Sequence, residues 1–198
     1  MSENLFFNKS DLLYCGENVI IGKTVRIRRP ELVSIGDNTI IDDFTYISCK
    51  LNIGNYCHIA SNVNMSGGNG EIIIGDFVGI ASGCSLHPCS SDYLIASLDL
   101  PSVPPKYRFG GQCETIFIED YVLLGANTVV LPGVKLPEGF ASAAHSTISK
   151  KEYSPWTLYG GLNASKIIHR SPKKLKNVIQ QMKDDGVYDG NKNNRYTK

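Results

Sequence analysis

An aliphatic residue recurs at every sixth position over most of this 198-residue chain. A six-residue period matches neither the 3.6-residue repeat of a helix nor the two-residue alternation of a simple strand. It is typical of a hexapeptide β-solenoid, in which each hexad supplies a short strand and a turn and points one side chain inward. The repeated positions are Ile35, Ile41, Ile47, Ile53, Ile59 and Met65, then Ile74, Ile80 and Leu86, then Ile118, Leu124, Val130, Leu136, Ser142 and Ile148.

The interruptions of this period also follow a rule. Three hexads would close one triangular coil, and extra residues follow Ile27, Met65 and Leu86. All of these insertions then fall at a coil boundary, so we expect them to leave the prism from one corner. Loops as long as the last one are usually functional or disordered in compact proteins. The coils would begin at Ile35, Ile53, Ile74, Ile118 and Leu136.

The period divides the chain into three parts. We expect an N-terminal cap over residues 1–20, a solenoid over 21–150 with an inserted loop at 87–117, and a C-terminal extension over 151–198. Ser171 and Pro172 predict the start of a helix that runs through 173–183, and we expect it to pack on the end of the solenoid. The last ten residues are predicted to be a disordered tail.

Composition narrows the classes of function. The formal net charge is +1, which gives no overall field for nucleic acid. The first residues lack a signal-peptide pattern, and no apolar run is long enough to predict a membrane span. The six cysteines form no C-x-x-C pair, so we expect reduced thiols in a cytoplasmic protein.

Several segments of the second half match a known signature. "LLGANTVVLPGVKLPEG", "STISK" and "PWTLYGG" resemble the C-terminal signature of the hexapeptide acyltransferases. "SSDY" at residues 90–93 and "PSVPPKYR" resemble a loop of the sugar acetyltransferases that modify lipopolysaccharide or capsule precursors. The resemblance implies an all-β, left-handed parallel β-helix and a homotrimer. Acetyl-CoA would lie in a groove between two subunits, with a sugar or nucleotide-linked amino sugar as acceptor.

The resemblance also implies which residues hold acetyl-CoA. Ala126 and Ala144 are small where the pantetheine arm would pass, and Ser149 and Lys150 would meet the nucleotide end. The chain departs from the family pattern at "AAHS", which replaces "GAGS" and puts His145 in the pantetheine region. A second departure is "GLNAS" in place of "GNPAK".

Acetyl transfer to a hydroxyl needs a base, and histidine has a suitable pKa range. His87 follows a repeated position at the root of the inserted loop, so it is the first candidate for a base or a substrate-positioning residue. Asp92 is the second, as a partner of the base or of an acceptor amine. An amine acceptor would need less, because a deprotonated amine is already nucleophilic. We expect a structural role for His58 and a surface position for His169.

Three other functions fit less well. A zinc enzyme on the same prism would need three converging histidines, and the spacing of the histidines predicts no metal site. A non-catalytic binding or assembly module would not need the acyltransferase signature. An acyltransferase with a non-sugar acceptor remains a third reading, and both O- and N-acetylation fit these residues.

Overall fold

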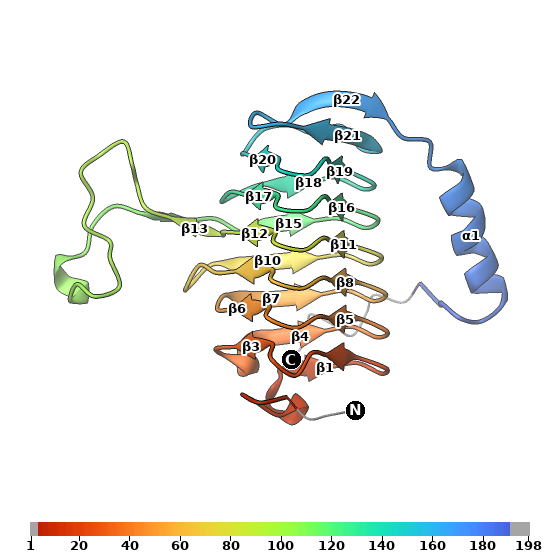
Figure 1. Ribbon diagram of the computed structural model, residues 1–198, viewed down its shortest axis with the longest axis horizontal. Helices are drawn as coiled ribbons and strands as arrows, with labels where there is room; N and C mark the ends of the chain where they lie inside the picture. Colours follow the sequence, from red (N-terminus) through yellow and green to blue (C-terminus); the bar gives the residue numbers. More distant parts are fainter. Residues whose placement is uncertain (1–3, 191–198) are drawn as a thin grey trace.

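The computed structural model describes residues 4–190 of the chain as a triangular prism of stacked coils (Figure 1). Each coil contributes one short strand to each of three parallel faces, and the prediction of a parallel β-solenoid is confirmed. The first face contains β1 (Tyr14–Cys15), β4 (Val33–Ile35), β7 (Lys50–Ile53), β10 (Glu71–Ile74), β15 (Ile116–Ile118) and β18 (Lys135–Leu136). The second face contains β2 (Ile20–Ile21), β5 (Ile40–Ile41), β8 (His58–Ile59), β11 (Gly79–Ile80), β16 (Leu123–Leu124), β19 (Ala141–Ser142), β21 (Thr157–Gly160) and β22 (Ser165–His169). The third face contains β3 (Arg26–Ile27), β6 (Tyr46–Ile47), β9 (Asn64–Met65), β12 (Ser85–Leu86), β17 (Val129–Val130) and β20 (Thr147–Ile148).

The interior consists of columns of repeated residues that pair in register from coil to coil. Ile41, Ile59 and Ile80 stack in this way on the second face, and each is at most 1% exposed. Ser142 continues the column and is the polar exception in the repeat. Its hydroxyl accepts a hydrogen bond from the Gly125 amide at 3.0 Å and lies 2.9 Å from the Thr128 hydroxyl, so the buried oxygen is satisfied.

The three corners of the prism have different characters. The first corner joins the first face to the second, the second corner joins the second face to the third, and the third corner returns to the first face. Every predicted coil start lies on the first face, so the insertions do leave from the third corner, as expected. The solenoid begins earlier than expected, because β1 and β2 already pair with β4 and β5. Residues 14–20, assigned above to the cap, therefore belong to the first coil.

The inserted loop extends away from the prism on the left of Figure 1. Its root is an antiparallel pair formed by β13 (Cys89–Ser90) and β14 (Gln112–Cys113), and a 3-10 turn, η3 (Pro105–Tyr107), lies near its tip. A disulfide joins Cys89 to Cys113, so the prediction of six reduced thiols is wrong for this pair. The two cysteines are directly opposite in the β13–β14 register, a proximity that their separation of 24 residues does not indicate.

The C-terminal extension covers the prism differently from the prediction. The antiparallel hairpin β21–β22 adds to the end of the second face, whereas α1 (Lys173–Asp184) lies beside the prism (Figure 1). Ile179 is the buried residue of the helix. The segment after the helix returns to the first corner, where the Tyr188 hydroxyl donates to Asp76 Oδ2 at 3.0 Å. The part of the predicted disordered tail from residue 191 onward lies outside the described residues.

Two 3-10 turns lie near the N-terminus. The first, η1 (Lys9–Asp11), precedes β1, and the second, η2 (Pro30–Leu32), lies between β3 and β4. In the described part of the chain, no helix is long and apolar enough to cross a membrane.

Candidate active site

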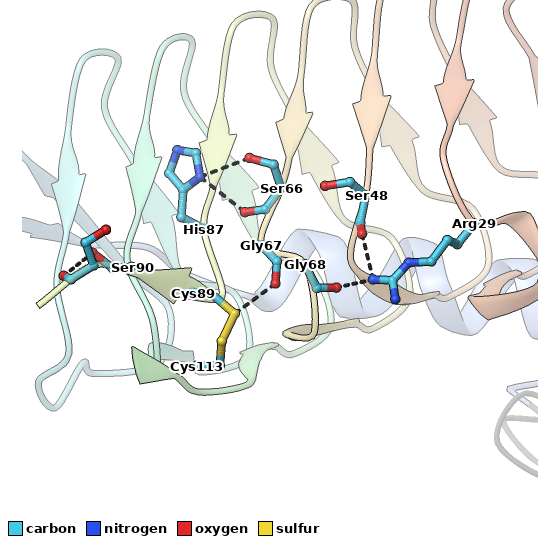
Figure 2. Close-up of a disulfide and its surroundings, with 10 residues drawn as sticks. Arg29, Ser48, Ser66, Gly67, Gly68, His87, Cys89, Ser90 and Cys113 are labelled. Carbon is cyan, nitrogen blue, oxygen red and sulfur yellow. Dashed lines mark hydrogen bonds between the residues drawn. A yellow bond between two sulfur atoms is a disulfide. The ribbon is translucent and has the colours of Figure 1, made fainter. Parts of the chain in front are cut away.

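His87 lies at the third corner, immediately after β12 and at the root of the inserted loop. Its Nδ1 is 3.3 Å from both the carbonyl oxygen and the hydroxyl of Ser66, one coil below (Figure 2). A carbonyl oxygen can only accept a hydrogen bond, so this contact places the ring proton on Nδ1. The neutral ring then presents Nε2 as a proton acceptor. Ser66 is a partner of His87 that the sequence analysis missed.

The disulfide lies close to this histidine. Figure 2 shows Cys89 and Cys113 beside the Gly67–Gly68 turn that follows Ser66. A Cβ added to Gly67 would lie 2.8 Å from a ring carbon of Pro88, so the close approach of these two turns requires glycine there. The loop root is thus packed against the coil below, and its position relative to His87 is defined.

Asp92 lies five residues beyond His87, in the first turn of the loop. Its Oδ1 accepts hydrogen bonds from the Leu94 amide at 2.9 Å and the Ile95 amide at 3.3 Å. This turn orients the carboxylate and leaves Oδ2 for another donor. His87 bonds Ser66 and Asp92 bonds the Leu94 and Ile95 amides, so in the described residues the two predicted catalytic side chains have separate hydrogen-bond partners.

The predicted cofactor residues divide between two corners. Ala126, Ala144 and His145 lie at the second corner, where the His145 amide donates to the Ala126 carbonyl at 2.8 Å. Ser149 and Lys150 follow β20 at the third corner, where Lys150 pairs with Glu114. The third face separates the two groups. Lys150 also lines a surface hollow with Lys135, Lys151, Glu119, Glu152 and Tyr153.

The backbone explains the unusual residue in "AAHS". His145 has a φ of 55°, in the left-handed region that favours glycine. Asn127 occupies the equivalent turn one coil below with a φ of 58°, and Gly83 the turn below that with 74°. His145 is exposed, so its ring projects outward at the top of this corner.

A column of side chains descends the second corner from Ala144. Every member below Ala144 accepts a backbone hydrogen bond at its carbonyl from the coil above, which establishes the alignment. The amide of Asn62 donates to Asp43, that of Gly83 to Ser61, that of Asn127 to Ser82, and that of His145 to Ala126. The column changes from methyl groups to hydroxyls in its middle, where Ser61 Oγ and Ser82 Oγ are 3.4 Å apart. In order from the top, it contains Ala144, Ala126, Ser82, Ser61 and Asp43. Sequence reasoning missed the two serines, although the 21-residue spacing between them is the length of one interrupted coil.

The corner also contains a histidine–carboxylate pair. His58 Nε2 is 2.7 Å from Asp42 Oδ2, and both side chains are partly exposed. The structural role predicted for His58 did not anticipate this partner. In residues 4–190, no three His, Cys, Asp or Glu side chains converge in a way that could hold a metal ion.

Comparison with known proteins identifies the family to which this chain belongs. No protein-family model matches the chain. A dTDP-4-amino-4,6-dideoxy-D-glucose acyltransferase of Escherichia coli is 34% identical over 164 residues, which cover 81% of this chain and 84% of the relative. The chain belongs to the hexapeptide-repeat acyltransferases, and it is an enzyme of the acyltransferase type.

Solved structures make the relationship more specific. AntD, an N-acyltransferase from Bacillus cereus solved with dTDP and 3-hydroxybutyryl-CoA, is 31% identical, with a TM-score of 0.83. That match covers 92% of this chain and 99% of AntD. A hexapeptide-repeat acetyltransferase from Vibrio cholerae, at 23% identity and a TM-score of 0.55, shares the fold. The relatives described here are therefore an acyltransferase named for a nucleotide-linked amino sugar and an N-acyltransferase solved with dTDP and an acyl-CoA.

Proposed function

We propose that this protein transfers an acyl group from an acyl-CoA thioester to the amino group of a nucleotide-linked amino sugar. The amine nitrogen attacks the thioester carbonyl, a C–N bond forms, the C–S bond breaks, and coenzyme A leaves as the thiol. One proton is lost from the nitrogen and one is gained by the sulfur, so the reaction is balanced without a redox partner. Acetyl-CoA is the proposed donor.

The choice of an amine acceptor rests on AntD, an N-acyltransferase that was solved with dTDP-4-amino-4,6-dideoxyglucose, and a shared spacing supports the choice of residues. Structures of AntD with its ligands include variants of a serine and of an aspartate that lie ten residues apart in that protein. In this chain Ser82 and Asp92 have the same spacing. Ser82 lies in the second-corner column and Asp92 at the loop root, so a loop from one copy could bring the two together at a groove between subunits.

We propose that Asp92 is the general base. Its oriented carboxylate can take the proton from the attacking nitrogen, a contribution of about a hundredfold or more in rate. Ser82 lies where the column changes from methyl to hydroxyl groups, and it would hold the acceptor amine or the thioester oxygen. His87 would then position the acceptor, and it would be the base if the acceptor were a hydroxyl.

The cofactor would follow the apolar part of the column. Ala126 and Ala144 leave space for the pantetheine arm beside the prism, and His145 would border it. Ser149 and Lys150 would contact the nucleotide end, where the lysines of the hollow favour an anionic phosphate. Ala144→Trp is expected to weaken acetyl-CoA binding at least tenfold in calorimetry, with an unchanged Tm, because it fills this path. An unchanged affinity would place the cofactor elsewhere.

The active unit is proposed to be a homotrimer in the cytoplasm, supplying precursors for bacterial surface polysaccharide. The loop supports an assembly, because Tyr93 is 87% and Leu94 98% exposed, and a neighbouring copy would cover them. Light scattering should give the mass of three chains. A monomer that remains active at nanomolar concentration would contradict this.

The reaction is tested by thiol release. The protein is incubated with acetyl-CoA and either dTDP-4-amino-4,6-dideoxyglucose or the same nucleotide sugar with a hydroxyl in place of the amine. We expect free coenzyme A and an amide product only with the amine. Turnover with the hydroxyl compound alone would favour the O-acetyl alternative and His87. No turnover with either, or with a panel of other nucleotide-linked amino sugars, would contradict the proposal.

A further inference from the structure

The second corner carries a second group of exposed side chains, two and three coils below Ala126. Asp42 and Phe44 come from the turn after β5, and His58 from β8 on the next coil. The His58–Asp42 contact and a backbone bond from the Asn62 amide to the Asp43 carbonyl connect the two coils. Ser61 adjoins this bond and contacts Ser82 above it. The group is thus continuous with the proposed reaction centre.

Phe44 is unusual within its own turn. It has a φ of 64° and a side chain that is 66% exposed, whereas the next three equivalent turns use Asn62, Gly83 and Asn127 and the topmost uses His145. The left-handed backbone itself recurs at the first corner, where the half-buried Tyr56 and Phe77 adopt it, so the exposure of its ring is what distinguishes Phe44. The Thr24 hydroxyl stabilises the turn, because it accepts from the Phe44 amide at 3.1 Å and donates to Asp43 Oδ1 at 2.7 Å. An apolar ring is therefore held firmly in an exposed position.

His58 is also held with one side available. Its Nε2 faces Asp42, and among the described residues Nδ1 has no hydrogen-bond partner. A carboxylate that fixes one ring nitrogen orients the other toward a ligand. The side chains of His58 and Asp42 are 57% and 44% exposed, so a ligand can reach both.

We infer that Phe44, Asp42, His58 and Ser61 form the binding site for the sugar ring of the acceptor. An aromatic face packs against the apolar C–H face of a deoxysugar, and a few fixed polar groups select its orientation. Asp42 and Asp43 give this corner negative charge, which favours hydroxyl and ammonium groups over phosphates. Hydrogen bonds from Thr24 lower the pKa of Asp43 and so maintain that charge. The inference rests on the proposed function, because it names the acceptor side of the same groove.

The test compares two probes by calorimetry, dTDP and dTDP-4-amino-4,6-dideoxyglucose. In Phe44→Ala and His58→Ala, we expect the Kd of the amino-sugar nucleotide to rise about tenfold and that of dTDP to change less than twofold. His58→Gln, which keeps a hydrogen-bonding group, should recover part of the loss. His169→Ala, at an exposed histidine of β22, is the matched control and should leave both affinities unchanged.

Steady-state kinetics should show the same selectivity. The KM for the acceptor should rise in Phe44→Ala and His58→Ala with little change in kcat, because these residues bind the ring away from the reacting bond. Equal losses for both probes would mean that the corner binds the nucleotide, and unchanged affinities would mean that it binds neither; each overturns the inference. Calorimetry measures binding without turnover. The Kd comparison therefore tests this inference even if the acyltransfer reaction itself is not observed. Thermal unfolding shows whether Phe44→Ala or His58→Ala has lost its fold. If one has, Asp42→Asn is measured in its place, with the same expected effect on the two probes.

Discussion

The prism and the inserted loop follow opposite rules of construction. In the prism, Ile47 and its repeats are fully buried and pair in register with the same kind of residue above and below. In the loop, Leu94 is 98% exposed, and the order comes from one disulfide, a two-residue strand pair and local hydrogen bonds. Arg108, for example, donates from Nη2 to the Pro101 carbonyl at 2.6 Å. The comparison indicates that the repeat supplies the buried core that stabilises the fold, whereas the inserted loop contributes little to that core and can carry functional residues.

The largest expected effect is on kcat, and it distinguishes Asp92 in the loop from His87 at the corner of the prism. Asp92→Asn should lower kcat about a hundredfold or more with an amine acceptor, because the nitrogen loses its base. His87→Ala, at the prism corner, should lower it less than about fivefold. Both are measured by thiol release, with the Kd of acetyl-CoA as a control for folding. The reverse order of the two effects would make His87 the base and would favour a hydroxyl acceptor.

Stability should show the opposite ranking. Ile47→Ala removes a fully buried side chain from a close-packed column and should lower the free energy of unfolding by about 2–5 kcal/mol. Leu100→Ala changes a loop side chain that is 54% exposed and should stay within about 0.5 kcal/mol. Chemical denaturation measures both. A large loss from Leu100→Ala would show that the loop contributes to the stability of the prism.

The cysteines extend the comparison to high pH. Burial raises the pKa of Cys49 in the prism to about 12. The unfolded chain ionises this thiol from about pH 9, so stability is complete below that pH and is lost as the pH rises toward 12. We expect this group to contribute a loss of about 1.4 kcal/mol per pH unit over that range. Denaturation at pH 8, 9.5 and 11 should show a shallower decline in Cys49→Ala; parallel curves would contradict the shift.

Reduction should give the smallest effect on the fold. Dithiothreitol opens the Cys89–Cys113 bond, whose two-residue strand pair is too short to hold the loop root by itself. Proteolysis between residues 92 and 111 should become faster, while Tm changes by less than about 2 °C. Cys89→Ser should behave like the reduced protein without the reagent. A Tm loss of more than about 5 °C would mean that the loop supports the prism.

The sequence by itself determined the coils. An aliphatic side chain at every sixth residue can be buried only if each hexad turns one corner. The repeat that includes Ile35, Ile53 and Ile74 therefore predicted the faces, the corner of the insertions and the extent of the solenoid up to β20. The acyltransferase signature in "LLGANTVVLPGV" predicted the class of enzyme. These features are local or periodic, and a single chain displays them directly.

Only the tertiary structure decided which side chains meet. Ser61 and Ser82, Asp42 and His58, and Cys89 and Cys113 are each separated by 16 to 24 residues, and their contacts depend on how many residues each corner inserts. Packing likewise decided how the prism ends. Strand β21 pairs with β19 and extends the second face, so the end of the prism is covered by the β21–β22 hairpin, and α1 lies beside the prism. A repeat defines the direction of each side chain, but the register between coils defines its partner.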